Sequence, residues 1–331
     1  MNLSDPSRRD VLKFAGLAAA AATFGPAAAH AFAAASFRPQ RGRALRIAHL
    51  TDIHIEPEKR ADQGTAAAIR HANALADKPD LIITGGDHVF DSFEAAEART
   101  RVQWELFAAA VAAENRIPVL SCLGNHDCWG WNKKRSGTTG EEPLWGKARA
   151  TDQLKMPARF HSAERAGWHL VFLDSIFPHG DGYIGKIDEE QFEWLKGDLA
   201  AVKPGTPTLV TSHIPIFSIA AMQFGGKDER PANEVDPSLM HLDAGRLHKL
   251  FLQDQSRHGE RGGVKLCISG HLHLLDRCEF DGVTYLCNGA VCGNWWKGRH
   301  QQCDEGYAVL DLFDDGTFER RYQTYGWKAV P

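Results

Sequence analysis

Short apolar runs alternate with longer segments whose apolar residues recur every three to four positions, beginning at residue 44. The short runs predict buried strands, and the longer segments predict helices that each bury one face. The strands are predicted at 44–55, 80–84 and 117–123, and the helices at 61–76 and 93–113. Because strands that alternate with helices are typical of layered folds, we expect an α/β fold in this part of the chain.

Residues 128–167 interrupt this alternation. The segment contains three tryptophans, a basic run and closely spaced glycines, and we interpret it as a cap-like insertion, because long irregular segments inside compact domains are often functional. Beyond it, Asp188–Gln191 has the form of a capping box and predicts the start of a helix. Further strands are predicted at 168–174, 208–212 and 264–269, and a further helix at 244–255.

Two Asp-Gly pairs, at 281–282 and 315–316, predict turns between the last apolar runs of the chain. We therefore expect C-terminal antiparallel strands over residues 276–325. A two-residue turn in the first hairpin would place Cys278 opposite Tyr285.

Polar fragments rich in Asp, His and Asn lie at the ends of five predicted strands, where open α/β sheets bind their ligands. They are Asp52-Ile53-His54, Gly86-Asp87-His88, Gly124-Asn125-His126-Asp127, Ser212-His213 and Gly270-His271-Leu272-His273. In an extended chain residues i and i+2 point the same way, so Asp52 and His54 could bind one ion, and His271 and His273 could face one cluster. This mixture of ligands suits Fe, Mn or Zn, and the two oxygens of Asp87 could bridge two ions.

In type and order, these fragments resemble the calcineurin-like metallophosphoesterase superfamily, whose pattern is D-x-H, G-D, G-N-H-[D/E], H and G-H-x-H. The resemblance spans about residues 45–275, and it is greatest to bacterial cyclic-nucleotide-phosphodiesterase-like members. It implies an α/β sandwich of two mixed β-sheets flanked by helices, with two metal ions. The implied ligands are Asp52, His54, Asp87 and His273 for one ion, and Asp87, Asn125, His213 and His271 for the other.

The same resemblance implies that His126 acts beside the scissile phosphate and that Asp127 orients it. At one position this chain differs from the purple acid phosphatases, which are one branch of the family. Purple acid phosphatases carry a tyrosine ligand where this chain has Phe90, so a tyrosinate–iron chromophore is not expected. We expect the neighbouring His88 to be a packed histidine rather than a substrate contact.

Several further residues are candidates for substrate contact. Two adjacent tryptophans in a strand cannot both face a core, so one of Trp295 and Trp296 is expected to be exposed in a loop near the site. Trp129 and Trp131 directly follow the Gly-Asn-His-Asp fragment and are expected to line the pocket. The complete set is Asn125, Trp129, Trp131, Trp295, Trp296 and Lys297.

The N-terminal residues have the pattern of an export signal. Paired arginines, Arg8-Arg9, precede a mildly apolar alanine-rich stretch and an Ala-x-Ala site that ends at Ala31. This resembles a twin-arginine signal, which implies export of the folded protein by the twin-arginine translocase to the periplasm or beyond. We therefore expect a signal peptide at 1–31, a short extension at 32–43 and a single metallophosphoesterase domain at 44–331.

Composition excludes several classes of protein and of binding partner. Hydrophobic residues make up 43% and charged residues 24% of the 331 residues, as in ordinary globular proteins. The net charge of −4 argues against a nucleic-acid partner, and no apolar run reaches the roughly 18 residues of a membrane-spanning helix, so stable membrane insertion is not expected. Seven cysteines are too few for a disulfide scaffold, and we expect small buried thiols or, in an exported protein, one or two disulfides.

The predicted function is a metal-dependent phosphoesterase that acts on a small-molecule phosphoester through a hydroxide activated by two metal ions. A phosphodiester is the favoured substrate, because the aromatic cap has no obvious arginine clamp for a dianion. A periplasmic nucleotide or phosphomonoester phosphatase is the close alternative. A non-catalytic protein that binds phosphate ligands is the remote one.

Overall fold

The computed structural model describes residues 41–223 and 234–329 of the protein, and everything described from Arg43 onward belongs to one compact unit. The expected signal peptide at 1–31 and nearly all of the extension at 32–43 lie outside the described residues. Within the described part of the chain, every helix is too short or too polar to cross a membrane.

The first sheet has five strands in the order β13-β12-β1-β2-β3. Its strands are β1 (Arg43–Leu50), β2 (Leu81–Thr84), β3 (Val119–Ser121), β12 (Gly306–Phe313) and β13 (Phe318–Thr324). β1, β2 and β3 are parallel, whereas β12 runs antiparallel to both of its neighbours. The sheet is therefore mixed, and the three parallel strands end at the same edge.

The second sheet has six strands in the order β10-β11-β9-β8-β5-β4. Its strands are β4 (His161–Arg165), β5 (Trp168–Leu173), β8 (Pro207–Ser212), β9 (Gly263–Ser269), β10 (Asp276–Phe280) and β11 (Val283–Cys287). The central strands are parallel, and the outer strands β4 and β10 are antiparallel to their neighbours. A separate two-stranded ladder joins β6 (Ile176–His179) to β7 (Gly182–Gly185).

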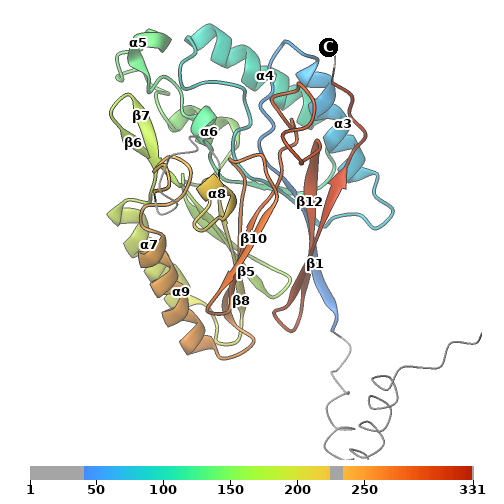
Figure 1. Ribbon diagram of the computed structural model, residues 1–331, viewed down its shortest axis with the longest axis vertical. Coiled ribbons are helices and arrows are strands. Elements are labelled where there is room, and N and C mark those ends of the chain that lie inside the picture. Colours follow the sequence, from blue (N-terminus) through green and yellow to red (C-terminus); the bar gives the residue numbers. More distant parts are fainter. Residues whose placement is uncertain (1–40, 224–233, 330–331) are drawn as a thin grey trace, which may run out of the picture. The chain divides into compact units, whose positions relative to one another are not determined.

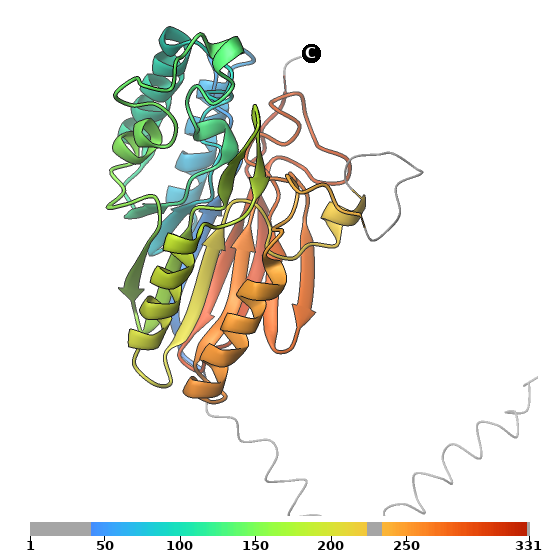
Figure 2. The ribbon, with the colours of Figure 1, turned by 90° about the vertical axis from the view of Figure 1, so that its left-hand side faces the viewer.

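Helices cover the outer faces of both sheets (Figures 1 and 2). α3 (Ala61–Asn73) and α4 (Glu97–Glu114) pack on the first sheet, and α7 (Glu189–Ala201) and α9 (Ala244–His258) pack on the second. The inner faces of the two sheets share a third apolar core, to which Ile47, Leu170 and Leu310 belong. The expected α/β sandwich of two mixed sheets flanked by helices is confirmed.

The burial of strand β1 explains why most of its residues are apolar. Leu45 and Ile47 face the core between the sheets, and Ala48 and Leu50 face the core beneath α3 and α4. Because both faces of the strand are buried, both alternating sets of side chains are mostly apolar. One buried exception, Arg46, is paired with Asp311 of β12.

The start of α7 is predicted correctly, but its capping is only half of a capping box. The Asp188 side chain accepts a hydrogen bond from the Gln191 amide at 2.9 Å. The Gln191 side chain does not reach back to residue 188. It pairs instead with the backbone N–H and C=O of Asp174, each at 2.8 Å, and so ties the helix to the end of β5.

The segment 128–167 holds more regular structure than the irregular cap we expected. It contains α5 (Lys133–Ser136) and α6 (Ala148–Gln153), and its end is β4, the edge strand of the second sheet. The two C-terminal hairpins form as predicted, with Cys278 opposite Tyr285, but they belong to different sheets. All seven cysteines are unpaired, and all but Cys278 are buried.

Two buried histidines on β4 and β5 have opposite electrostatic surroundings. The His161 ring stacks on Phe172 with centroids 4.7 Å apart, and burial lowers its pKa below the ordinary value. Burial also opposes protonation of His169. There, however, Asp198 and Glu164 lie 2.8 and 2.6 Å from the ring nitrogens and raise the pKa of His169 above the ordinary value of 6.5.

Candidate metal centre

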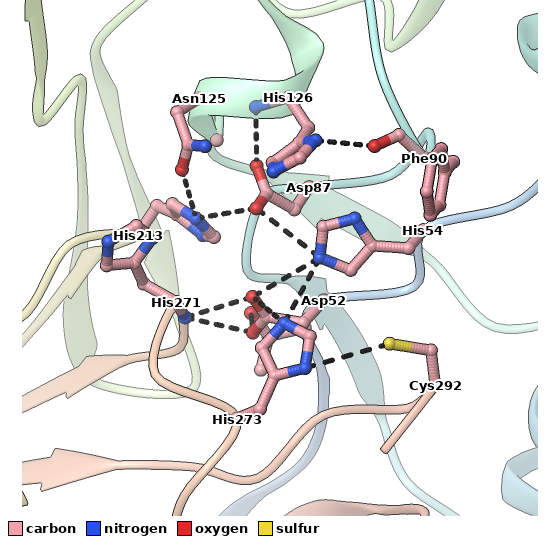
Figure 3. Close-up of polar contacts among 12 residues, drawn as sticks. Asp52, His54, Asp87, Phe90, Asn125, His126, His213, His271, His273 and Cys292 are labelled. Atoms are coloured by element: carbon pink, nitrogen blue, oxygen red, sulfur yellow. Dashed lines mark hydrogen bonds and ion pairs between the residues drawn. The ribbon is translucent and has the colours of Figure 1, made fainter. Parts of the chain in front are cut away.

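The polar fragments meet where the parallel strands of both sheets end (Figure 3). Asp52, Asp87 and Asn125 follow β1, β2 and β3 of the first sheet. His213 follows β8 of the second sheet, and both His271 and His273 follow β9. The centre therefore lies across the adjoining edges of the two sheets, and all seven residues that we expected as ligands reach it.

The backbone at these residues is not extended, which corrects our expectation for the D-x-H and H-x-H fragments. Five of the seven have positive φ values: Asp52 (54°), His54 (47°), Asp87 (53°), His271 (71°) and His273 (56°). Residues other than glycine rarely adopt this backbone conformation, which costs of order 1 kcal/mol or more per residue. The side chains converge because the chain turns sharply at each ligand, not because alternate residues of a strand share a face.

One half of the centre brings together two imidazoles and two carboxylates. The Nε2 atoms of His54 and His273 are 3.1 Å apart. Asp52 Oδ1 lies 3.4 Å from His273 Nε2, and Asp87 Oδ2 lies 3.5 Å from His54 Nε2. The Nδ1–H of His273 donates to the Gly293 carbonyl at 2.6 Å, so the Nε2 lone pair of His273 faces the centre.

The other half lies beyond Asp87. His213 Nε2 is 3.2 Å from Asp87 Oδ2 and 3.2 Å from Asn125 Oδ1. The Nδ1–H of His213 donates to the Gly85 carbonyl at 2.8 Å, which again leaves Nε2 for a ligand. A donor atom of His271 lies within 4.8 Å of donor atoms of Asp87 and His213.

The Asp87 carboxylate faces both halves. Its Oδ1 accepts a hydrogen bond from the His126 amide at 2.8 Å, and its Oδ2 contacts both His54 and His213. The loop after β3 can approach this closely because residue 124 is glycine. A Cβ at Gly124 would lie 2.2 Å from both the backbone nitrogen and Oδ1 of Asp87.

Charge and burial at this centre fit metal ions. The side chains of Asp52, His54, Asp87, His213 and His273 are at most 3% exposed. Burial acts to raise the pKa of Asp52, but His273 and His213 together outweigh it, and the pKa lies below the ordinary value. Burial acts to lower the pKa of His213, but Asp87, Asp52 and the Gly85 carbonyl together outweigh it and raise the pKa to about 9.

Two imidazole lone pairs 3.1 Å apart repel each other unless a proton or another cation lies between them. Buried carboxylates beside them also need positive charge. Imidazole nitrogen, carboxylate oxygen and amide oxygen are together a donor set for borderline transition metals.

His126 lies beside the centre, but Asp127 does not orient it. The His126 ring is half-buried, and its centroid is 4.7 Å from that of His54. Its Nδ1 donates to the carbonyl of Phe90. The fully buried Asp127 carboxylate accepts instead from the amides of Gly124 and His88. This corrects the role expected for Asp127, which the resemblance to the family implied.

His88 is a packed histidine, as expected. It is fully buried, and its ring lies 5.1 Å from that of Phe107 and 5.9 Å from that of Trp104. Its Nδ1 is 2.9 Å from Asp127 Oδ2, and its Nε2 is 2.7 Å from Thr84 Oγ1.

Three of the tryptophans expected at the substrate are buried elsewhere. Trp296 is fully buried in the core beneath α3 and α4, Trp129 is covered by Arg149, and Trp131 packs against Phe93. These residues stabilise the surrounding segments and offer almost no surface to a ligand. The expectation that they contact substrate is therefore wrong for this structure.

Trp295 is half-buried, whereas we expected one tryptophan of the pair to be exposed, but it does lie beside the site. Its ring centroid lies 4.4 Å from that of His273, and the neighbouring Lys297 is exposed. Sequence reasoning missed two other half-buried rings beside the centre. His300 meets His273 edge-on at 5.9 Å, and Tyr183 meets His271 edge-on at 6.1 Å. Neither residue belongs to a motif that could have pointed to it.

Comparisons with known proteins agree with this geometry. The family model described as Calcineurin-like phosphoesterase matches residues 45–275. The chain belongs to the calcineurin-like phosphoesterase family. It is therefore a metal-dependent phosphoester hydrolase, and membership of this family implies divalent metal ions. A second model, the twin-arginine translocation pathway signal sequence, matches residues 5–25 and indicates export by the twin-arginine route.

Two curated proteins are similar to this one over most of the chain. A "Probable cyclic nucleotide phosphodiesterase" of Rhodococcus erythropolis is 26% identical over 259 residues, which cover 74% of this chain and 70% of the relative. A "cAMP/cGMP dual specificity phosphodiesterase" of Mycobacterium tuberculosis is 25% identical over 256 residues, covering 74% of this chain and 67% of the relative.

Solved structures show the same fold. A dimetal phosphatase from Danio rerio superposes with a TM-score of 0.57 at 13% identity, covering 86% of this chain and 97% of the other. At that identity the likeness concerns the fold alone.

Proposed function

We propose that this calcineurin-like phosphoesterase hydrolyses phosphodiesters at a dinuclear centre bridged by Asp87. The observation that carries the proposal is the position of Asp87 Oδ2, 3.5 Å from His54 Nε2 and 3.2 Å from His213 Nε2. Asp52, His54, Asp87 and His273 would hold one ion, and Asp87, Asn125, His213 and His271 the other. Iron, manganese and zinc all suit these ligands.

Two bound ions would supply Lewis-acid stabilisation of the phosphoryl oxygens and activation of the attacking water. The chain's own contribution is to fix their ligands. Hydrogen bonds from Nδ1 to backbone carbonyls set the tautomers of His213 and His273 and aim their Nε2 atoms at the centre.

His126 would protonate the leaving oxygen. Its Nδ1–H is committed to the Phe90 carbonyl, so Nε2 is the atom that can transfer a proton to the substrate. Its amide donates to Asp87 Oδ1, which holds the imidazole beside the bridging carboxylate. A backbone carbonyl replaces the carboxylate that we expected as its partner, so the ring is oriented without added negative charge.

The preference for a diester rests on what flanks the centre. Trp295 lies beside His273 on one side, and Tyr183 lies beside His271 on the other. These two aromatic side chains would accommodate two organic groups on one phosphorus. Among the described residues, no lysine or arginine forms an ion pair with Asp52 or Asp87, and a dianionic monoester would gain most from such a cation. The names of the curated relatives point the same way.

A substrate panel distinguishes this proposal from its alternatives. We expect higher kcat/KM for bis(4-nitrophenyl) phosphate and cyclic nucleotides than for 4-nitrophenyl phosphate and nucleoside monophosphates. The reverse order would identify a phosphomonoester phosphatase. Tight binding of phosphate esters without turnover, in protein that carries metal, would identify a binding protein.

Metal analysis of the same samples tests the bridge. The wild-type protein should contain close to two transition-metal ions per chain, and Asp87→Asn should lose most of them together with most activity. Asp254→Asn is the matched control, because Asp254 is equally buried but accepts from the Val264 amide at the far end of β9. Full metal content and activity in Asp87→Asn would refute the bridging role.

A further inference from the structure

Asp127 and His88 are unused by the proposed chemistry, yet they connect the two loops that supply the second ion's site. The Asp127 carboxylate accepts from the amides of Gly124 at 2.9 Å, Asp87 at 3.0 Å and His88 at 2.8 Å. The first amide belongs to the loop after β3, and the other two belong to the loop after β2. One buried carboxylate thus joins the loop that carries Asn125 to the loop that carries Asp87.

His88 anchors this carboxylate to the sheet. Its Nδ1–H donates to Asp127 Oδ2 at 2.9 Å, and its Nε2 forms a hydrogen bond with Thr84 Oγ1 at 2.7 Å. Thr84 Oγ1 in turn bonds Ser121 Oγ at 2.7 Å. Thr84 and Ser121 end β2 and β3 and are register partners, so the contacts return to the strands from which the two loops emerge.

The His88 ring is held in place independently of these hydrogen bonds. Phe107 meets it edge-on at 5.1 Å, and Trp104 lies against it at 5.9 Å, both from α4. Because none of the imidazole is exposed, water cannot replace a lost partner, and a missing hydrogen bond would leave a buried polar group unsatisfied.

We infer that His88 and Asp127 are positioning residues that set the distance between Asp87 and Asn125. The inference rests on the proposed dinuclear function. It predicts an asymmetric effect. The amides of Asp52 and His54 donate directly to the carbonyls of Gly86 and Asp87, so these two residues stay joined to the loop after β2 without Asp127. The loop that carries Asn125 is joined to the Asp87 amide through the Asp127 carboxylate. Loosening the contact between His88 and Asp127 should weaken the ion held with Asn125, His213 and His271 far more than the other ion. Partners of this kind typically contribute 10–100-fold to metal affinity.

The test compares two replacements of His88 in the full mature protein. His88→Phe keeps a ring for Trp104 and Phe107 but removes both hydrogen bonds. His88→Asn keeps an N–H for Asp127 but loses the contact with Thr84. Each protein, loaded with Mn²⁺, is dialysed against falling Mn²⁺ concentrations, and bound Mn²⁺ and the exchange-coupled Mn–Mn electron paramagnetic resonance signal are measured.

The expected result is a 10–100-fold weaker affinity for one ion only in His88→Phe, with loss of the coupled signal, and partial recovery in His88→Asn. His161→Phe, a matched change in another buried and stacked histidine, should bind both ions as the wild type does. If His88→Phe does not fold, Thr84→Val removes the far end of the same contacts with little change of shape, and it should weaken the same ion by less.

Unchanged affinity for both ions in folded His88→Phe would overturn the inference. Equal weakening of both ions, without recovery in His88→Asn, would also overturn it, because that is the mark of general destabilisation. The wild-type titration separates this failure from that of the proposed function. Wild-type protein that binds fewer than two ions refutes the dinuclear centre itself.

Discussion

Replacing Gly64 with alanine should destabilise the protein, although the same change stabilises most helices. Gly64 lies within α3, where glycine costs about 1 kcal/mol relative to alanine. A Cβ at this position would lie 2.1 Å from Cζ3 of Trp296 and within 2.8 Å of two further ring atoms. Since carbon atoms pack best at about 3.5–4.0 Å, the indole would have to move by more than about 1 Å.

The indole has no free space and a specific partner. Trp296 is fully buried, packs edge-on against Trp327 at 5.6 Å, and donates from Nε1–H to the His54 carbonyl at 2.9 Å. Overpacking of this kind costs about 1–3 kcal/mol, and loss of the hydrogen bond costs about 1 kcal/mol more. After the gain in helix propensity of about 1 kcal/mol, the free energy of unfolding should fall by roughly 1–3 kcal/mol.

Urea unfolding of Gly64→Ala, monitored by tryptophan fluorescence, measures the fall in the free energy of unfolding directly. The control is Gly197→Ala in α7, where an added Cβ meets nothing within 4 Å and should stabilise by about 0.5–1 kcal/mol. Activity should fall in Gly64→Ala alone, because the displaced indole donates to the backbone carbonyl of His54, a proposed metal ligand. Stabilisation of both variants by similar amounts would refute the argument.

His126→Ala should keep its metal and lose roughly 10²–10⁴-fold in turnover of esters with alkoxide leaving groups. The loss should be smaller for 4-nitrophenolate, which departs without a proton, and equal losses would contradict proton donation. The raised pKa of His169 implies stability that is present below about pH 6.5 and is lost as the pH rises through the folded-state pKa. His169→Gln should therefore destabilise more at pH 6 than at pH 9. His161, whose pKa is lowered, makes the fold less stable as the pH falls below 6.5, so His161→Gln should cost less at pH 5 than at pH 8. A common trend in urea unfolding of the two variants would contradict this reasoning.

The convergence of the proposed ligands could be predicted from the sequence because their position follows from topology. Asp52, Asp87 and Asn125 come directly after parallel strands, and parallel strands of one sheet end at one edge. Residue type then narrows the chemistry, since Asp, Asn and His at such an edge are potential ligands. The same reasoning cannot reveal that a second sheet supplies His213 and His273, and only the resemblance to a family made that expectation.

Side-chain partners could not be predicted in this way. Asp127 is adjacent to His126 in sequence, yet its carboxylate turns toward the loop after β2, because the chain folds into a short 3₁₀ turn at residues 125–127. The prediction that Trp129 and Trp296 contact the substrate failed for a related reason. Trp129 and Trp296 are close to the site along the chain, but their size suits the cores beneath it, and burial of a large aromatic surface is strongly stabilising.

The strained backbone at the proposed ligands requires surrounding contacts that hold it in place. Positive φ at Asp52, Asp87 and His273 opposes folding, and so does the burial of their charges. The folded state can hold this strain and these buried charges only if other contacts stabilise it. The sheets and the loop contacts, including those of Asp127, would hold the ligands in place before any ion binds. An ion that binds only the folded chain, and not the unfolded chain, then increases the free energy of unfolding. On the proposed dinuclear function, we therefore expect preorganisation of the loops and retention of the metal to be coupled, so that a residue that contacts no ion, such as Asp127, affects how many ions are bound.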